Sequence, residues 1–310
     1  MSLREKAVKG VAWSAVQNWG SSLITTVVLL ILANLLEVET FGLVAFASVF
    51  TAFLQIFQRQ GFAQALIQRA DLEPGHLSTT FWTSAVSGLL LTIGLVAASG
   101  LVSQCVDKPE LTPVLQWLSL TLLIDALGNT PQAILRRNLA FKSLAMRSLV
   151  ASLAGGVVGV GMALHGFGIW SLVGQRLTAS LAGTITLWIA CDWRPGLAVS
   201  FRHFRDLFGF GVYAMGNETV SFFNRQTPDL LIGTFLGMTA LGYYAVGYRF
   251  LLIMTQMFTQ TVSAVALPTF SRLQHDHAQM RQALLTATRM TSLAAFPAFM
   301  GMAVLAPELV

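Results

Sequence analysis

Apolar and polar positions alternate along this chain in blocks rather than residue by residue. Stretches of about 20 or more mostly apolar residues are separated by short polar gaps, a pattern that predicts helices long enough to cross the hydrocarbon core of a bilayer. About nine such segments are expected, at residues 11–36, 40–66, 79–104, 112–133, 144–164, 167–190, 207–236, 240–268 and 288–309. The pattern therefore predicts an all-α polytopic membrane protein.

Basic residues gather on one side of this predicted topology. When the N-terminus is placed in the cytoplasm, most of the 19 lysine and arginine residues fall in cytoplasmic segments, and only Lys108 falls in an outer loop. This bias follows the positive-inside rule and predicts a cytoplasmic N-terminus. The basic start, MSLREKAVKG, precedes an apolar run longer than the core of a signal peptide, so the first segment is expected to remain as a transmembrane helix.

The composition supports a membrane protein and argues against several other classes. Apolar residues are 55% of the chain, charged residues are 11%, and the mean hydropathy is +0.66. The formal charge of +5 comes from the lysines and arginines of the loops, so no nucleic-acid partner is expected. The sequence shows no catalytic Ser/His/Asp arrangement, phosphate-binding glycine loop or metal-spaced His/Cys cluster. We therefore expect a transporter rather than an enzyme, with no cofactor or metal.

The chain matches itself at an offset of 200 residues. LILANLLEVETFGLVAFASVF (Leu30–Phe50) aligns without gaps with LLIGTFLGMTALGYYAVGYRF (Leu230–Phe250), and Gly42 falls on Gly242. Six predicted helices separate the two copies, so both copies have the same orientation in the membrane. Many transporters are built from two such repeats around a central substrate path.

The repeat divides the chain into two predicted domains. Residues 1–200 are expected to form an N-terminal bundle of six helices. Residues 201–310 are expected to form the first three helices of a second, parallel bundle. Three more helices, on the order of 100 residues, would be needed to complete that second copy, so the chain is expected to be truncated.

The seventh predicted helix carries charged side chains where burial in a bilayer is most expensive. Its polar part reads GNETVSFFNRQTPDLLIGTFLG (216–237), and at 100° per residue one face holds Glu218, Ser221, Arg225 and Asp229, with Asn217 and Asn224 on the flank. Each charge costs about 2.5–3.5 kcal/mol at mid-membrane. This face is therefore expected to line a polar cavity or to pack against polar partners. Arg225 and Asp229 lie one turn apart, a spacing at which they can pair.

Polar positions on two other predicted helices are candidates for the same cavity. The equivalent face of the first helix, 200 residues earlier, holds Asn18, with Gln17 beside it. The eighth helix holds Arg249 and Gln256. Arginine has a permanent charge and a planar fork of donors that suits phosphate oxygens, so Arg225 and Arg249 together favour an anionic substrate.

The acidic residues have two interpretations that the sequence leaves open. Glu218 and Asp229 are expected either to hold the cavity arginines in place or to bind a coupling proton or Na⁺. Asp125 on the fourth predicted helix and Arg176 on the sixth are expected either to form an internal ion pair or to serve in transport.

Five stretches carry a resemblance to a known family. They are ETFGLVAFASVFTAFLQIFQRQGFAQALIQR (39–69), LSTTFWTSAVSGLLL (77–91), PQAILRRNLAFKSLAMR (131–147), GFGIWSLVGQRL (166–177) and LFGFGVYAMGNETVSFFNRQTPDLLIG (207–233). The chain resembles the bacterial polysaccharide transporter family, the Wzx-type flippases. That family belongs to the larger exporter superfamily that also contains multidrug antiporters and the lipid II flippase.

The resemblance implies a substrate and a mechanism. In such proteins undecaprenyl diphosphate carrying an oligosaccharide moves across the bacterial inner membrane by alternating access between two six-helix bundles. Cationic residues facing the central cavity are thought to meet the diphosphate or anionic sugars, and Arg225 and Arg249 match best here, with Asn18 and Gln17 as neutral contacts. The resemblance also implies membrane lipid, and other membrane proteins of polysaccharide assembly, as partners.

Two other functions make different demands on the sequence. A cation-coupled multidrug antiporter of the same superfamily would need a mainly acidic cavity. The intramembrane set here is balanced between Arg176, Arg225 and Arg249 and the acids Asp125, Glu218 and Asp229. A membrane polymerase or glycosyltransferase would need a large exposed loop to carry its catalytic residues. No predicted loop here is longer than about 20 residues, the length of one spanning helix, so the sequence offers no such loop.

Overall fold

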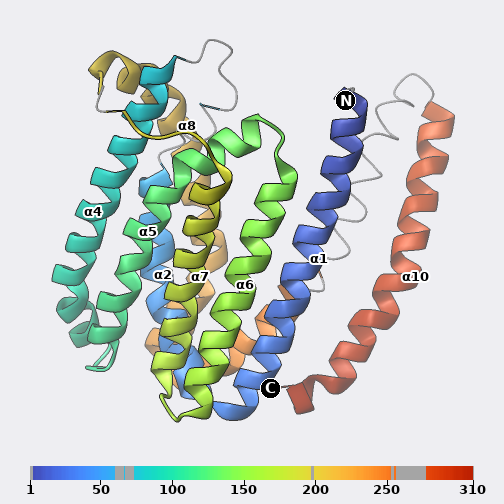
Figure 1. Ribbon diagram of the computed structural model, residues 1–310. Helices are drawn as coiled ribbons and strands as arrows, with labels where there is room; N and C mark the ends of the chain where they lie inside the picture. Colours follow the sequence, from blue (N-terminus) through green and yellow to red (C-terminus); the bar gives the residue numbers. More distant parts are fainter. Residues whose placement is uncertain are drawn as a thin grey trace. The chain divides into compact units, whose positions relative to one another are not determined.

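A computed structural model describes residues 3–59, 66, 73–196, 199–252, 255 and 277–309 of the chain (Figure 1). Within these residues the secondary structure is helical, with turns and short connections and no strand. The chain separates into two compact units, Met1–Gly242 and Tyr243–Val310, which are described one at a time. The division at residue 200 expected from the internal repeat stays a prediction.

The described part of the first unit consists of long helices. They are α1 (Leu3–Leu35), α2 (Val38–Arg59), α4 (Pro74–Cys105), α5 (Leu111–Arg137), α6 (Phe141–Leu164), α7 (Ile169–Ala190) and α8 (Phe201–Leu231), followed by the π-helical turn η1 (Ile232–Leu236). A further helix covers residues 238–252 and crosses the boundary between the units. The second unit contains the rest of that helix and α10 (His277–Leu309).

Five of the described helical segments are long and apolar enough to cross a membrane. They are Val16–Leu35, Val38–Gln58, Gly75–Cys105, Leu111–Arg137 and Phe141–Leu164. The prediction of a helical, multi-pass membrane protein is therefore confirmed. Polar residues interrupt α7 and α8, which is why these two helices are missing from that set, and the expected number of nine spans stays a prediction.

Neighbouring helices of the first unit pack with small residues at their contacts. In Figure 1, α4, α5, α7, α6 and α1 lie side by side, and their packing follows the pairs α4 with α5, α5 with α7, α7 with α6, and α6 with α1. A Cβ atom added to Gly155 of α6 would lie 2.7 Å from the carbonyl oxygen of Gln175 and 2.8 Å from Cβ of Ala179 on α7. Backbones can approach this closely only where side chains are small, as is usual between membrane helices.

The starts of α2 and of the helix at 238–252 make the tightest contact found at any glycine of the described residues. A Cβ atom added to Gly42 would overlap the carbonyl oxygen of Met238. The contact is reciprocal, because a Cβ atom added to Gly242 would overlap the carbonyl oxygen of Val38. Only glycine allows the two backbones to touch at both positions.

Tryptophans mark both ends of α7. At its start, Trp170 makes an edge contact with Trp117 of α5, with ring centroids 6.5 Å apart. At its end, Trp188 stacks on Trp193, and the Arg194 guanidinium lies 5.6 Å from the centre of the Trp188 ring. Tryptophan is enriched where a membrane protein meets the two bilayer interfaces.

A proline and a glycine end α8. Pro228 lies inside the last turn of α8, where it can donate no hydrogen bond, and the π-helical turn η1 follows. Gly237 then adopts a left-handed conformation, with φ of 89°, and the next helix begins at residue 238. These features separate α8 from the helix at 238–252.

Candidate functional site

An aromatic contact within the first unit fixes α8 on α2. Phe222 of α8 is buried, and its ring lies 5.2 Å from that of Phe53 on α2, measured between centroids. Phe223 approaches the same Phe53 ring at 6.2 Å. One side of α8 is therefore held by apolar packing, and the polar side next to it is left uncovered by the first unit.

The polar face predicted for α8 is largely exposed. Glu218, Arg225 and the flanking Asn217 and Asn224 are exposed, whereas Asp229 is half-buried. The apolar Val220 and Phe223 of α8 are exposed as well, so exposure is not confined to the polar face. Ionisable side chains on a membrane helix cannot remain against lipid, because each one costs several kcal/mol there. The exposed face is the candidate functional site.

Arg225 does not pair with Asp229, although the two lie one turn apart. The Nε–H of Arg225 donates to the carbonyl oxygen of Ser221 at 3.3 Å, and no Arg225–Asp229 ion pair is found within the described residues. The hydrogen bond directs the arginine side chain toward the preceding turn, as is usual for long side chains on helices. Asp229 lies in the following turn, on the other side of Arg225, and is out of reach of the guanidinium. The sequence spacing allowed the pair, and the side-chain direction prevents it.

Asp125 and Arg176 form no ion pair within the described residues, and a role for either in transport stays a prediction. Asp125 accepts hydrogen bonds from the Ser180 hydroxyl at 2.5 Å and from the Gln55 amide at 3.3 Å, while Arg176 is exposed. Where α5 and α7 meet, α7 presents small hydroxyl side chains: Thr184 donates to the carbonyl oxygen of α5 residue Ile124 at 3.2 Å. Neutral donors from α7 and α2 therefore satisfy the Asp125 carboxylate.

On α1, Gln17 connects two helices. Its amide donates to the Ser148 hydroxyl of α6 at 3.1 Å, so it helps to hold α1 on α6 rather than pointing freely into a cavity. Asn18 is half-buried. Its role as a neutral cavity contact stays a prediction.

The remaining two cavity candidates do not belong to the described part of the first unit. Arg249 is exposed on the helix at 238–252, in the part that belongs to the second unit. Gln256 lies outside the described residues. That Arg225 and Arg249 share one cavity therefore stays a prediction.

One polar group was not expected from the sequence. Glu73, His76 and His203 lie together where the start of α4 meets the start of α8, and their ligand atoms are all within 4.8 Å of one another. Glu73, the residue before α4, and His76 in the first turn of α4 are three residues apart, and this spacing was the signal available in the sequence. His203 is 130 residues further from Glu73, and no local pattern connects it to them.

The sequence matches a known family over most of its length. The model of a family described as polysaccharide biosynthesis protein covers residues 31–310. The chain is 29% identical over 298 residues to the succinoglycan biosynthesis transport protein ExoT of Rhizobium meliloti, with 96% of this chain and 60% of that protein aligned. It is 27% identical to the teichuronic acid biosynthesis protein TuaB of Bacillus subtilis, covering 97% of this chain and 63% of that one.

Further similarities point the same way. The lipopolysaccharide biosynthesis protein WzxC of Escherichia coli is 24% identical over 100% of this chain and 63% of its own length. The chain thus spans less than two thirds of these relatives. Among solved structures, an inward-facing multidrug resistance transporter of the MATE family and MOP superfamily matches with a TM-score of 0.52 and 17% identity, covering 100% of this chain and 72% of that one. This last likeness concerns the fold alone.

Proposed function

The chain belongs to the polysaccharide biosynthesis protein family, and from this we propose that it helps to move undecaprenyl-diphosphate-linked oligosaccharide units across the bacterial inner membrane. The relatives named for succinoglycan transport, teichuronic acid biosynthesis and lipopolysaccharide biosynthesis support a polysaccharide-related transport role. The lipid carrier, its diphosphate and the mechanism are parts of the proposal.

The observation that carries the proposal is the exposed ionic face of α8. Arg225 is exposed, and its guanidinium has no carboxylate partner within the described residues. Its fork of donors suits the oxygens of a diphosphate. An unpaired arginine at mid-membrane costs free energy and does not stabilise a bundle of apolar helices, so a polar substrate path best explains the presence of Arg225.

The reciprocal glycine contact supports a transporter with two related halves. Gly42 and Gly242 are 200 residues apart, and so are their contact partners, Val38 and Met238. Gly42 meets Met238, and Gly242 meets Val38, so adding or subtracting 200 turns one contact into the other. A two-fold relation between the halves would produce this pair of contacts. We propose that α2 and the helix at 238–252 are equivalent elements of the two halves and meet on the axis between them. Alternating access would rock the halves about such an axis.

The distribution of charge supports a cytoplasmic N-terminus. Arg136 and Arg137 end α5, at the same end of the first unit as the start of α1. Glu39 and Lys108 lie at the opposite end, where they form an ion pair of 2.7 Å. We propose that the end with Arg136 and Arg137 faces the cytoplasm, in agreement with the positive-inside rule.

The experiment is complementation of a deletion strain. Without the gene, complete lipid-linked oligosaccharide units should accumulate on the cytoplasmic leaflet, and the full-length gene should clear them. Arg225→Ala should leave the pool uncleared, and Arg225→Lys should clear it only in part, because lysine keeps the charge and loses the fork. Arg205→Ala is the matched control, since Arg205 is also exposed on α8 but lies in its first turns.

Two results would contradict the proposal. If Arg225→Ala clears the pool as well as Arg205→Ala does, the α8 face is not part of the substrate path. If deletion leaves both the lipid pool and the surface polysaccharide unchanged and raises sensitivity to cationic drugs, the protein is a multidrug antiporter instead.

A further inference from the structure

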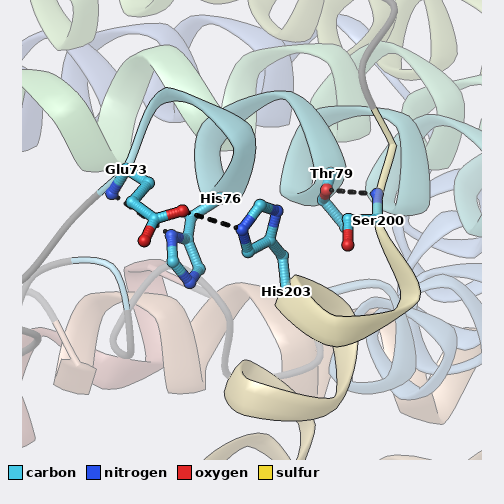
Figure 2. Close-up of polar contacts among 5 residues, drawn as sticks. All are labelled: Glu73, His76, Thr79, Ser200 and His203. Carbon is cyan, nitrogen blue, oxygen red and sulfur yellow. Dashed lines mark hydrogen bonds and ion pairs between the residues drawn. The ribbon is translucent and has the colours of Figure 1, made fainter.

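Two histidines and a glutamate meet between α4 and α8. Figure 2 shows the His203 ring beside Glu73 and His76, and its Nε2 atom lies 3.1 Å from Oε2 of Glu73. The rings of His76 and His203 have centroids 4.2 Å apart. His76 is only 2% exposed, and the side chains of His203 and Glu73 are 17% and 64% exposed. The group is thus buried on the histidine side and open at the carboxylate.

The segment before α8 holds His203 in this position. The amide of Ser200 donates to the Thr79 hydroxyl at 3.1 Å, as Figure 2 shows, and the amide of Gly196 donates to the Ser78 hydroxyl at 3.2 Å. The indole of Trp82 donates to the carbonyl oxygen of Gly196 at 3.0 Å. Three hydrogen bonds to α4 therefore fix the chain just before His203.

Gly75 provides the space for the His203 ring. A Cβ atom at Gly75 would overlap Cε1 of His203 and lie 2.8 Å from its Nδ1. That Nδ1 atom is buried and finds no hydrogen-bond partner among the described residues. The space at Gly75 thus lets the His203 imidazole lie close to Glu73 and His76, with its Nδ1 atom left without a hydrogen bond among the described residues.

We propose that Glu73, His76 and His203 form a binding site for one divalent transition-metal ion of the zinc class. In a tetrahedral zinc site the bonds to nitrogen and oxygen are about 2.0–2.2 Å, so ligand atoms lie roughly 3.3 Å from one another. The 3.1 Å between His203 and Glu73 is close to that value. The third ligand atom, from His76, lies within 4.8 Å of the others. To join them, the His76 ring has to turn and give up the hydrogen bond that its Nδ1 accepts from the Glu73 amide at 3.2 Å.

The types of ligand select the class of ion. Two imidazoles and one carboxylate suit Zn²⁺, Co²⁺ or Ni²⁺, whereas Mg²⁺ and Ca²⁺ prefer oxygen ligands. Three protein ligands leave a fourth position for water on the exposed side of Glu73. A bound ion would connect α4 directly to the first turn of α8. It would therefore fasten α8, the helix with the candidate functional site, to the body of the first unit.

Metal binding by the purified, chelator-treated protein in detergent tests this proposal. Titration with Zn²⁺ against a chromophoric chelator should show one tight site per chain, and Co²⁺ at that site should give the visible absorption of tetrahedral coordination. Glu73→Gln and His203→Ala should each weaken Zn²⁺ affinity by more than about 10-fold, because each removes a direct ligand and even outer-shell changes cost 10–100-fold. Gly75→Ala should weaken it as well, by displacing the His203 ring.

Matched variants separate this site from other histidines. His165→Ala removes an exposed histidine at the end of α6, and Gly161→Ala adds a methyl group where nothing lies within 4 Å. Neither should change Zn²⁺ affinity. Glu73 is mostly exposed, so Glu73→Gln is expected to fold even if a histidine variant does not. If Glu73→Gln binds Zn²⁺ as tightly as the unchanged protein, or if no tight site is found, the group is an ordinary ion pair and the proposal is wrong.

Discussion

The reciprocal glycine contact predicts that one added methyl group at Gly42 lowers the stability of the first unit. In Gly42→Ala, the new methyl group would overlap the carbonyl oxygen of Met238 and lie 2.8 Å from its carbonyl carbon and 3.0 Å from the amide nitrogen of Gly242. All three atoms belong to the backbone, so no side-chain rotation can relieve the overlap. The two helices must move apart.

The size of the effect follows from two opposing terms. Replacing glycine by alanine in a helix interior normally stabilises by about 1 kcal/mol. Forcing extra atoms into a tight contact costs about 1–3 kcal/mol, and more where backbone must shift. We therefore expect Gly42→Ala to lose stability by roughly 1–2 kcal/mol. Gly94→Ala on α4, where nothing lies within 4 Å, should gain up to about 1 kcal/mol.

Unfolding in detergent can be followed with a thiol-reactive dye. Cys191 is buried and reacts only when the first unit opens, whereas Cys105 is exposed and can be replaced by serine beforehand. Gly42→Ala and Gly242→Ala should both lower the unfolding temperature, and the double variant should lose less than the sum of the two. One separation of the helices makes room for both methyl groups, so coupling of at least about 0.5 kcal/mol is expected. If Gly42→Ala unfolds at or above the temperature of Gly94→Ala, the close approach is refuted.

Two further predictions concern polar contacts within the first unit. Asp125→Ala should destabilise by about 1–3 kcal/mol because it leaves the donors of Ser180 and Gln55 without their acceptor, and Asp125→Asn should lose less in the same unfolding assay; equal losses would contradict the proposed hydrogen bonds. The ion pair with Glu39 raises the pKa of Lys108, chiefly through their hydrogen bond. The contribution of this ion pair to the free energy of unfolding is therefore complete below pH 10.5 and is lost as the pH rises through the raised pKa of Lys108. Both side chains are more than a third exposed, so Lys108→Met should cost less than about 1 kcal/mol at pH 8 and nothing well above pH 11. A pH-independent loss would show that the pair is not the cause.

The helices could be predicted from the sequence because each depends on a run of neighbouring residues. The expected segment 79–104 corresponds to α4, and 144–164 corresponds to α6, which begins three residues earlier. The expected start of the first helix at residue 11 was late, since α1 begins at Leu3. Hydropathy detects the part of a helix that lies in lipid, whereas backbone hydrogen bonding continues into the polar residues before it.

Side-chain partners could not be predicted in the same way. Helical periodicity predicts a polar face on α8 from neighbouring residues alone, and Glu218 and Arg225 of that face are exposed. The partner of Asp125 depends on which face of α7 meets α5, and charge complementarity alone suggested Arg176. The structure instead places Ser180 against the carboxylate, because short hydroxyl side chains permit close helix packing. Interhelical distance is a property of the folded bundle that no single segment encodes.

The aromatic contacts at the two ends of α7 have a consequence for the thickness of bilayer that suits this protein. Trp170 and Trp188 are 18 positions apart along one continuous helix, a rise of about 27 Å at 1.5 Å per residue. That length is close to the roughly 30 Å hydrocarbon core of an ordinary membrane. With both indoles at the interfaces, α7 has little freedom to tilt. A bilayer thinner or thicker by a few Å would have to deform around the helix, at a cost of fractions of a kcal/mol for each ångström of mismatch.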